Sequence, residues 1–313
     1  MIDLENLTVL KDLGKNDVYE SLIAVNNADN MKYFIKKTSK SIFLDEFKYK
    51  YFQNELNVNE EINHDNIIKL ITKKEILNDI YLLYECTNGG SLGNYFKKYM
   101  EQFNKPFPEE IVQYIMRQLS SGLKYLHENH IIHRCFDLDN IYLDFENLED
   151  KKNFELSKTK FKIGNFHFSK KLEDDQLAHS YVGVPAYMDP HILFNSDQQN
   201  DEGYDYKVDI WSLGVDCYEL LTGITPFDGE SVEELVLKVK EGTYKIPNSL
   251  NLSKEAVSFI SGILQYSNDK RLKIDDIINH EFLTKNVDQF THEGYDQFGE
   301  VNENELVLNI KIE

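Results

Sequence analysis

Cysteine is scarce in this chain: only Cys86, Cys135 and Cys217 occur among 313 residues, far apart from one another. An odd number of widely spaced cysteines indicates neither a disulfide framework nor a zinc cluster. Long apolar runs are also missing, since none approaches the roughly 20 residues of a membrane span. The first residues, MIDLENLTVLKDLG, are acidic and not typical of a secretory signal. We therefore expect reduced thiols and a cytoplasmic protein without a membrane partner.

Basic residues are in the minority, with 34 lysines and arginines against 54 aspartates and glutamates and a formal net charge of -20. Such a chain repels nucleic-acid phosphates, so we expect no nucleic-acid partner. Apolar side chains make up 41% of the residues and aromatic ones 12%. This content is enough for one large hydrophobic core or two modest ones.

The first part of the chain alternates apolar and polar residues with a period of two, which is typical of β-strands. The predicted strands are LTVLKDL, VYESLIAV, MKYFIKK, NIIKLI and DIYLLYEC. A helix is predicted between the third and fourth strands, from about Phe43 to Ile62. Residues 1–86 are thus predicted to form a small sheet with one helix.

The pattern changes after Gly89 and Gly90, which mark a hinge. Apolar residues then follow helical spacing at Ile111, Ile115, Leu119, Leu123 and Leu126. A later helix, Val208 to Leu221, is apolar on nearly every side, as expected for a helix at the centre of a domain, and Gly223 would end it. We assign residues 87–285 to a mainly helical region.

Residues 286–313 are predicted to form an acidic C-terminal tail. Val307, Leu308, Ile310 and Ile312 alternate near its end and could make a strand. Terminal segments are ordered only when something holds them in place, so a fixed tail would suit a subunit of an assembly.

Several short motifs occur in an informative order. Gly14 and Lys36 come first, Glu55 follows on the predicted helix, and then come HRC (133–135), Asn140, NFH (165–167), GVPAYMDPH (183–191), Asp209, Trp211 and Arg271. In this order they resemble the motifs of a protein kinase domain of the Ser/Thr type, over about residues 7–285. The resemblance implies an α+β, two-lobed fold, with a small N-terminal sheet lobe containing one long helix and a larger, mainly helical C-terminal lobe.

The departures from the family pattern concern the chemistry. Cys135 stands where the family has the aspartate that accepts a proton, and a thiol is mostly protonated at neutral pH. Asn165 replaces the aspartate that holds Mg²⁺, a cation that favours carboxylates. Asp137 replaces a lysine that lies near the transferred phosphate. Because phosphoryl transfer depends on positioning, metal ions and a base, all three changes predict lost catalysis.

The nucleotide pocket also differs from the family pattern. Phe34 is two residues before Lys36, so it is predicted to share its face of the strand and to enter the cleft. Tyr142 replaces the apolar residue of the adenine floor. We expect these two rings to fill the adenine space. Asn16 and Tyr19 replace the second and third glycines of the phosphate-binding loop, where a Cβ hinders close approach of the backbone.

The retained residues Lys36, Glu55 and Asn140 are interpreted as vestiges of nucleotide binding. Lys36 and Glu55 would hold the helix against the sheet as an ion pair, and Asn140 would hold the catalytic loop. Two rescues of activity stay open. Asp137 or Asp139 could act as a displaced base, or Cys135 could serve as a nucleophile in different nucleotide chemistry.

The predicted regulatory segment contains two candidate phosphorylation sites, Ser180 and Tyr181, with Arg134 as the potential phosphate partner. His191 replaces a glutamate that in the family pairs with the arginine at Arg271, and Asp189 is a candidate substitute. The charged insertion DFENLEDKKNFELSKTK is predicted to be a solvated hairpin.

Together these features predict a degenerate kinase, or pseudokinase, that uses neither ATP nor Mg²⁺, holds no metal, and acts as an interaction, scaffolding or allosteric subunit. The expected partner is another protein or a larger assembly, for which a cytoskeletal structure is our guess. The first alternative is a weakly active or ATP-binding Ser/Thr kinase.

Overall fold

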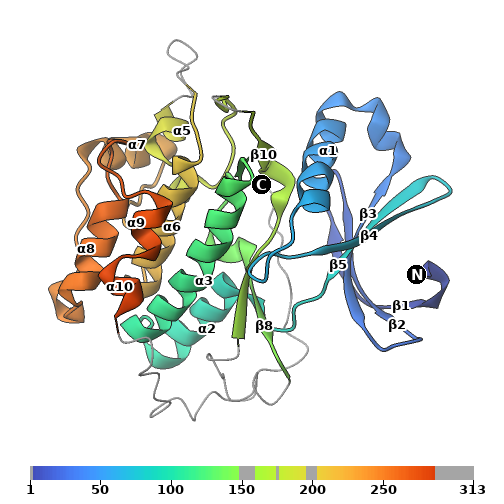
Figure 1. Ribbon diagram of the computed structural model, residues 1–313, viewed down its shortest axis with the longest axis horizontal. Coiled ribbons are helices and arrows are strands. Elements are labelled where there is room, and N and C mark those ends of the chain that lie inside the picture. Colours follow the sequence, from blue (N-terminus) through green and yellow to red (C-terminus); the bar gives the residue numbers. More distant parts are fainter. Residues whose placement is uncertain (1–2, 148–158, 174–175, 195–202, 286–313) are drawn as a thin grey trace.

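The computed structural model describes residues 3–147, 159–173, 176–194 and 203–285. An antiparallel five-stranded sheet forms the N-terminal lobe (Figure 1), in the order β1-β2-β3-β5-β4. Its strands are β1 Leu7–Lys15, β2 Glu20–Asn26, β3 Lys32–Ser39, β4 Leu70–Ile76 and β5 Asp79–Glu85. A short 3-10 helix, η1 (Leu4–Asn6), precedes the sheet.

The two faces of the sheet bury different residues, as the period of a strand requires. Tyr33 and Ile35 of β3 pack on one face with Ala24 and Leu83. Phe34 packs against the cluster on the other face, which contains Leu82 and Tyr84 and lies beneath the long helix. The predicted position of Phe34 on the cleft side of β3 is therefore confirmed.

The long helix α1 (Glu46–Glu61) begins three residues later than predicted. The side chain of Asp45 accepts a hydrogen bond from the Lys48 amide, which caps the helix and fixes its beginning. Phe43 belongs instead to a separate 3-10 helix, η2 (Lys40–Leu44).

The predicted strand NIIKLI is wrong in position, because β4 covers Leu70–Ile76. The backbone of Ile68 donates to Ile163 O at 2.8 Å, and Ile163 N donates to Asn66 O at 2.8 Å. These residues pair with a strand of the C-terminal lobe, so their apolar side chains are buried between the lobes and not within the sheet.

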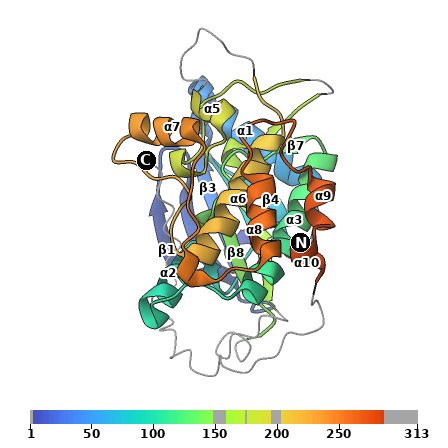
Figure 2. The same cartoon turned by 90° about the vertical axis from the view of Figure 1, so that its left-hand side faces the viewer.

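Helices make up most of the C-terminal lobe and surround α6 (Figures 1 and 2). They are α2 Leu92–Phe103, α3 Glu109–Glu128, α5 Pro190–Phe194, α6 Lys207–Thr222, α7 Val232–Glu241, α8 Lys254–Ile263, α9 Ile274–Ile278 and α10 Glu281–Thr284. The predicted central helix is confirmed, since nearly every residue of α6 is buried. Gly223 ends it with a φ of 84°, a conformation that favours glycine, and donates to Glu219 O at 2.7 Å.

The rest of the chain contributes short strands and 3-10 helices, several of them at the boundary between the lobes. The strands are β6 Gly90–Ser91, β7 Ile131–Ile132, β8 Ile141–Phe145, β9 Thr159–Ile163 and β10 Lys170–Lys171, and the 3-10 helices are η3 Leu138–Asn140, η5 Phe166–Phe168, η6 Pro185–Tyr187 and η7 Asn248–Leu250. Antiparallel β8 and β9 pair Phe145 with Thr159 at the base of the charged insertion. Most of that insertion, and the predicted tail strand, lie outside the described residues. Among the described helices none could cross a membrane.

Candidate nucleotide cleft and catalytic loop

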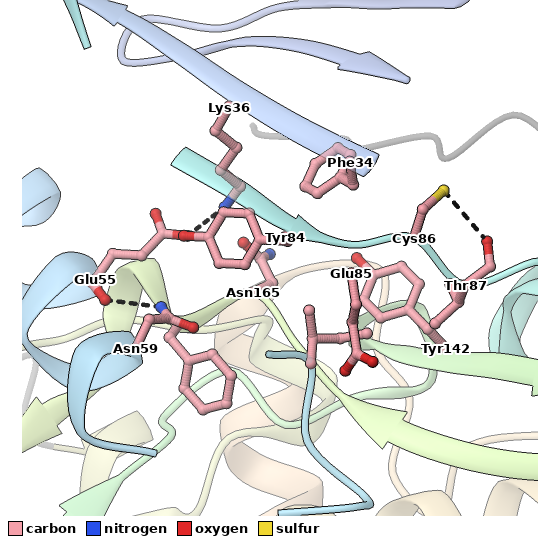
Figure 3. A pocket seen from close by; sticks show the side chains of 12 residues that line it. Phe34, Lys36, Glu55, Asn59, Tyr84, Glu85, Cys86, Thr87, Tyr142 and Asn165 are labelled. Carbon is pink, nitrogen blue, oxygen red and sulfur yellow. Dashed lines mark hydrogen bonds and ion pairs between the residues drawn. The ribbon is translucent and has the colours of Figure 1, made fainter. Parts of the chain in front are cut away.

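The candidate site is a cleft between the sheet and the C-terminal lobe (Figure 3). Phe34 enters from β3 on the sheet side, and Tyr142 enters from β8 on the opposite side. Both rings are among the residues that line the cleft. Burial raises the pKa of the Tyr142 phenol most, and the negative charge of Asp137 raises it further. The two rings thus line the cleft from the sheet side and from the opposite side, and their filling of the adenine space stays a prediction.

Lys36 is enclosed at the inner end of this cleft. Its Nζ lies 2.5 Å from Glu55 Oε1, 5.0 Å from the centre of the Tyr19 ring and 5.9 Å from that of Tyr84. Tyr84 Oη donates to the same Glu55 oxygen at 3.2 Å. Burial alone would raise the pKa of Glu55, but the Lys36 ammonium outweighs it and the pKa is lowered. The lysine charge is therefore neutralised and covered by two aromatic rings.

The loop between β1 and β2 binds its own amides. Asn16 Oδ1 accepts hydrogen bonds from the backbone N–H groups of Val18, at 2.8 Å, and Tyr19, at 2.6 Å. Backbone N–H groups of this kind are what a phosphate-binding loop offers to a ligand. Tyr19, at the third glycine position, is only 3% exposed because its ring turns inward toward Phe52 and Lys36.

Cys135 lies in a buried part of the catalytic loop, with 7% of the residue exposed. Its Sγ donates to Asp137 Oδ2 at 3.7 Å. Burial, and then the charge of Asp137, raise the pKa of this thiol well above its ordinary value. His133 does not activate it, because His133 Nδ1 accepts from the Cys135 amide at 3.3 Å and Nε2 lies 2.9 Å from Gly164 O.

Asp137 is a structural cap in this loop. Its Oδ1 accepts from the amides of Asp139 and Asn140, at 2.9 and 3.1 Å, and its Oδ2 accepts from Asn140 Nδ2 at 3.0 Å. Burial and the nearby charge of Asp139 raise the pKa of Asp137 to about 7. With only 5% of the residue exposed, this carboxylate serves the loop rather than the open cleft.

Asn140 and Asn165 contact each other directly, with Asn165 Nδ2 donating to Asn140 Oδ1 at 2.8 Å. The other amide oxygen, Asn165 Oδ1, lies 2.7 Å from Nδ1 of His167. Burial, followed by the positive charge of Lys36, lowers the pKa of His167 to about 3, so the ring is neutral. The carbonyl oxygen of Asn165, at the position that the resemblance assigns to Mg²⁺, thus already accepts from a protein donor. Because Asn165 brings no carboxylate, this position does not fit the cation.

The regulatory residues are placed apart from the cleft. Ser180 and Tyr181 are exposed, and the Ser180 carbonyl accepts from Tyr204 Oη at 2.6 Å. Arg134 is 8% exposed; its Nε donates to Phe168 O at 2.6 Å and its Nη1 lies 3.4 Å from Tyr204 Oη. Phosphorylation at Ser180 or Tyr181 stays a prediction.

Arg271 has the partner that the sequence indicated. Its Nη1 lies 2.5 Å from Asp189 Oδ2, and both side chains are fully buried. The same nitrogen donates to Lys207 O at 2.9 Å. His191, at the position of the family glutamate, contacts the other oxygen of Asp189 at 2.8 Å.

Three residues in or beside the cleft were not singled out from the sequence. Tyr84 is on β5 opposite Phe34, and a pairing of the two aromatic predicted strands could have indicated it. His167, which contacts Asn165, stood in the sequence only as the last residue of the NFH motif. Asn59 of α1 lines the cavity and donates to Glu55 O at 2.7 Å. Its place one helical turn after Glu55 was the available signal.

Comparison with known proteins agrees with this geometry. The family described as "Protein kinase domain" matches residues 7–283. Among similar proteins of Dictyostelium discoideum, "Probable serine/threonine-protein kinase fhkC" is 31% identical over 91% of this chain and 45% of its own length. "Serine/threonine-protein kinase atg1" is 31% identical over 74% of this chain and 32% of its own length.

"Myosin light chain kinase A" from the same organism is 29% identical, and the alignment covers 91% of both proteins. The chain thus spans less than half of the first two relatives and nearly all of the third. Because the family match extends over most of the sequence, with the two-lobed architecture and the ordered motifs, the chain belongs to the protein kinase domain family.

Proposed function

We propose that this protein is a catalytically inactive member of the family, a pseudokinase. The observation that carries the proposal is the side chain of Cys135. At the position of the proton-accepting aspartate it is a buried thiol whose pKa is raised and which donates a hydrogen bond to Asp137. A positioned base contributes typically 10²- to 10⁴-fold to such a reaction, and a protonated thiol cannot supply that contribution.

The cleft supports the same proposal, because Phe34 and Tyr142 line the space for the base from both sides and the loop amides already have a partner in the protein. The amides of Val18 and Tyr19 donate to Asn16. We therefore propose that neither ATP nor Mg²⁺ is a cofactor.

Without catalysis, the role that we propose for this protein is to bind other proteins in the cytoplasm, as a scaffold or an allosteric subunit. The partner we propose is another protein or a larger assembly. The likeness to a protein named "Myosin light chain kinase A" keeps a cytoskeletal assembly among the candidates. With a formal net charge of -20, the protein is suited to a neutral or basic protein surface more than to an acidic one.

A second candidate function is weak Ser/Thr kinase activity with Asp137 as a displaced base. It is favoured by one observation, the pKa of about 7 at Asp137, because a general base works best near the operating pH. The hydrogen bonds on both carboxylate oxygens oppose it. The third reading, nucleotide chemistry through Cys135, is opposed by the raised pKa of that thiol.

Transfer of labelled γ-phosphate to a mixture of protein substrates tests the proposal. We expect no metal-dependent transfer above a no-protein blank. Transfer that Asp137→Ala or Asp139→Ala abolishes would support the displaced base. Iodoacetamide could also block the transfer. If the alkyl group were then found on Cys135 and not on the more accessible Cys86, the result would support thiol chemistry. Either result would overturn the pseudokinase proposal.

A further inference from the structure

A chain of four side chains crosses the base of the cleft, and its hydrogen bonds have one direction. Asn140 Nδ2 lies 2.9 Å from Cys135 O, which can only accept, and 3.0 Å from Asp137 Oδ2, so the Asn140 amide nitrogen donates. Asn140 Oδ1 must then accept from Asn165 Nδ2. Asn165 Oδ1 must in turn accept from Nδ1 of His167. We call this chain of side chains, His167–Asn165–Asn140–Asp137, the amide relay. Each of its hydrogen bonds is donated in the direction of the Asp137 carboxylate.

The amide relay offers a divalent cation no free carboxylate. Both amide oxygens accept from a neighbouring N–H, and Asp137 accepts from two backbone amides, one side-chain amide and one thiol. A divalent cation such as Mg²⁺ needs several free oxygen ligands, preferably carboxylates. Within the described residues no group of three or more His, Cys, Asp or Glu side chains is arranged to hold a metal ion.

The relay joins two elements that are distant in sequence. Asn165 directly precedes η5, whose Phe166 is 1% exposed and packs edge-on against His133 at 5.1 Å. Phe168 of η5 contacts Tyr51 of α1, with ring centres 5.6 Å apart. A bond from Asn165 to the catalytic loop therefore fixes the position of η5, and through it the packing of α1.

We propose that the amide relay does the structural work of a cation, and that Asn165 is the positioning residue that makes this fold independent of metal. An aspartate at this position has no N–H to give to Asn140 Oδ1, so two acceptors would face each other. It would also add a negative charge close to Asp137 and Asp139. A bound cation would stabilise such a site. This inference deepens the proposed function, but its evidence is separate from nucleotide binding.

Thermal unfolding of the full chain, without nucleotide, in EDTA and in millimolar MgCl₂ or MnCl₂ tests the relay. The native midpoint should be equal in all three. Asn165→Asp should unfold roughly 2–6 °C lower in EDTA, the effect of one lost buried hydrogen bond, and should regain stability with Mg²⁺ or Mn²⁺. The matched control Asn165→Leu, with neither donor nor ligand, should lose stability without recovery.

The relay is overturned if the native chain gains as much from either cation as Asn165→Asp does, or if Asn165→Asp responds to neither EDTA nor cation. Should Asn165→Asp fail to fold, free Mn²⁺ measured by electron paramagnetic resonance decides. The native chain and Asn165→Leu should bind equal amounts, and one additional Mn²⁺ on the native chain would contradict the inference. Phosphate transfer without any such cation effect would contradict the proposed function alone.

Discussion

Asp216 is buried at the centre of α6, and neither of its carboxylate oxygens has a hydrogen-bond partner among the described residues. Burial, then the charges of Asp137, Glu219 and Asp139, raise its pKa well above the ordinary value. In the folded protein this carboxyl therefore keeps its proton to a higher pH than an ordinary aspartate does. In the unfolded chain an aspartate has a pKa of about 3.9 and is ionised.

Asp216→Leu should increase the free energy of unfolding, and the increase should grow with pH. The folded state keeps a proton that the unfolded chain releases above about pH 3.9, so native stability falls as pH rises, by up to about 1.4 kcal/mol per unit, until the folded pKa is reached. The leucine variant lacks this dependence. Urea unfolding at pH 5 and pH 7.5 measures both slopes.

Asp216→Asn is the matched control, because it removes the titration and keeps a buried polar group. It should lose the pH dependence with little gain at pH 5. The account of this residue would be contradicted if Asp216→Leu raised the free energy of unfolding equally at both pH values, or if it lowered that free energy at pH 7.5.

At the scale of single residues, the sequence showed which residues replace those of the family motifs, but not which side chains contact one another. Cys135, Asp137 and Asn165 were visible as replacements because a motif order fixed their places. The bond from Asn165 to Asn140 was not predictable, since the two are 25 positions apart on different elements. Tyr19 could be recognised as a replaced glycine, but its inward turn depends on the room beside Phe52.

At the scale of elements, the buried pair of Asp189 and Arg271 joins the beginning of α5 to the connection between α8 and α9. Arg271 also donates to Gln265 O, at 3.2 Å from Nε, and lies over the Trp211 ring of α6 at 5.1 Å. The arginine is therefore the point where three segments of the C-terminal lobe meet.

Asp189→Ala should lower the free energy of unfolding by about 3–5 kcal/mol, because it leaves the Arg271 charge buried without its carboxylate. The control is Asp228→Ala, which breaks an exposed pair with Lys238 on α7. Denaturant unfolding of both variants checks this, and equal losses would show that burial does not decide the cost.

The elements that the sequence predicted well are those whose ends have a chemical signal. Gly223 ended the predicted α6 within one residue of its observed limit. β4 was misplaced because buried apolar residues such as Ile67 look alike in a sheet and between two lobes. The beginning of α1 depended on the Asp45 cap, which an apolar pattern does not reveal.

At the scale of the molecule, side-chain contacts link the two lobes. Asn88, in the connection between them, makes two hydrogen bonds with the Phe145 backbone, at 2.7 and 3.0 Å. Lys162 of β9 pairs with Glu85 of β5 at 2.9 Å, with only 7% of the lysine side chain exposed. Phe34 and Tyr142 face each other from the two lobes across the cleft. These side-chain contacts hold the sheet of the N-terminal lobe against the strands at the edge of the C-terminal lobe.

The most direct test of the central claim is thermal unfolding with and without ATP, each with and without Mg²⁺, for the native chain and Phe34→Ala. A ligand that binds only the folded state, at 100 times its dissociation constant, adds about 2.7 kcal/mol and raises the midpoint visibly. We predict no rise for the native chain and a rise for Phe34→Ala, whose roof is open to adenine. A Mg²⁺-dependent rise in the native chain would contradict the account of a cleft filled by its own side chains.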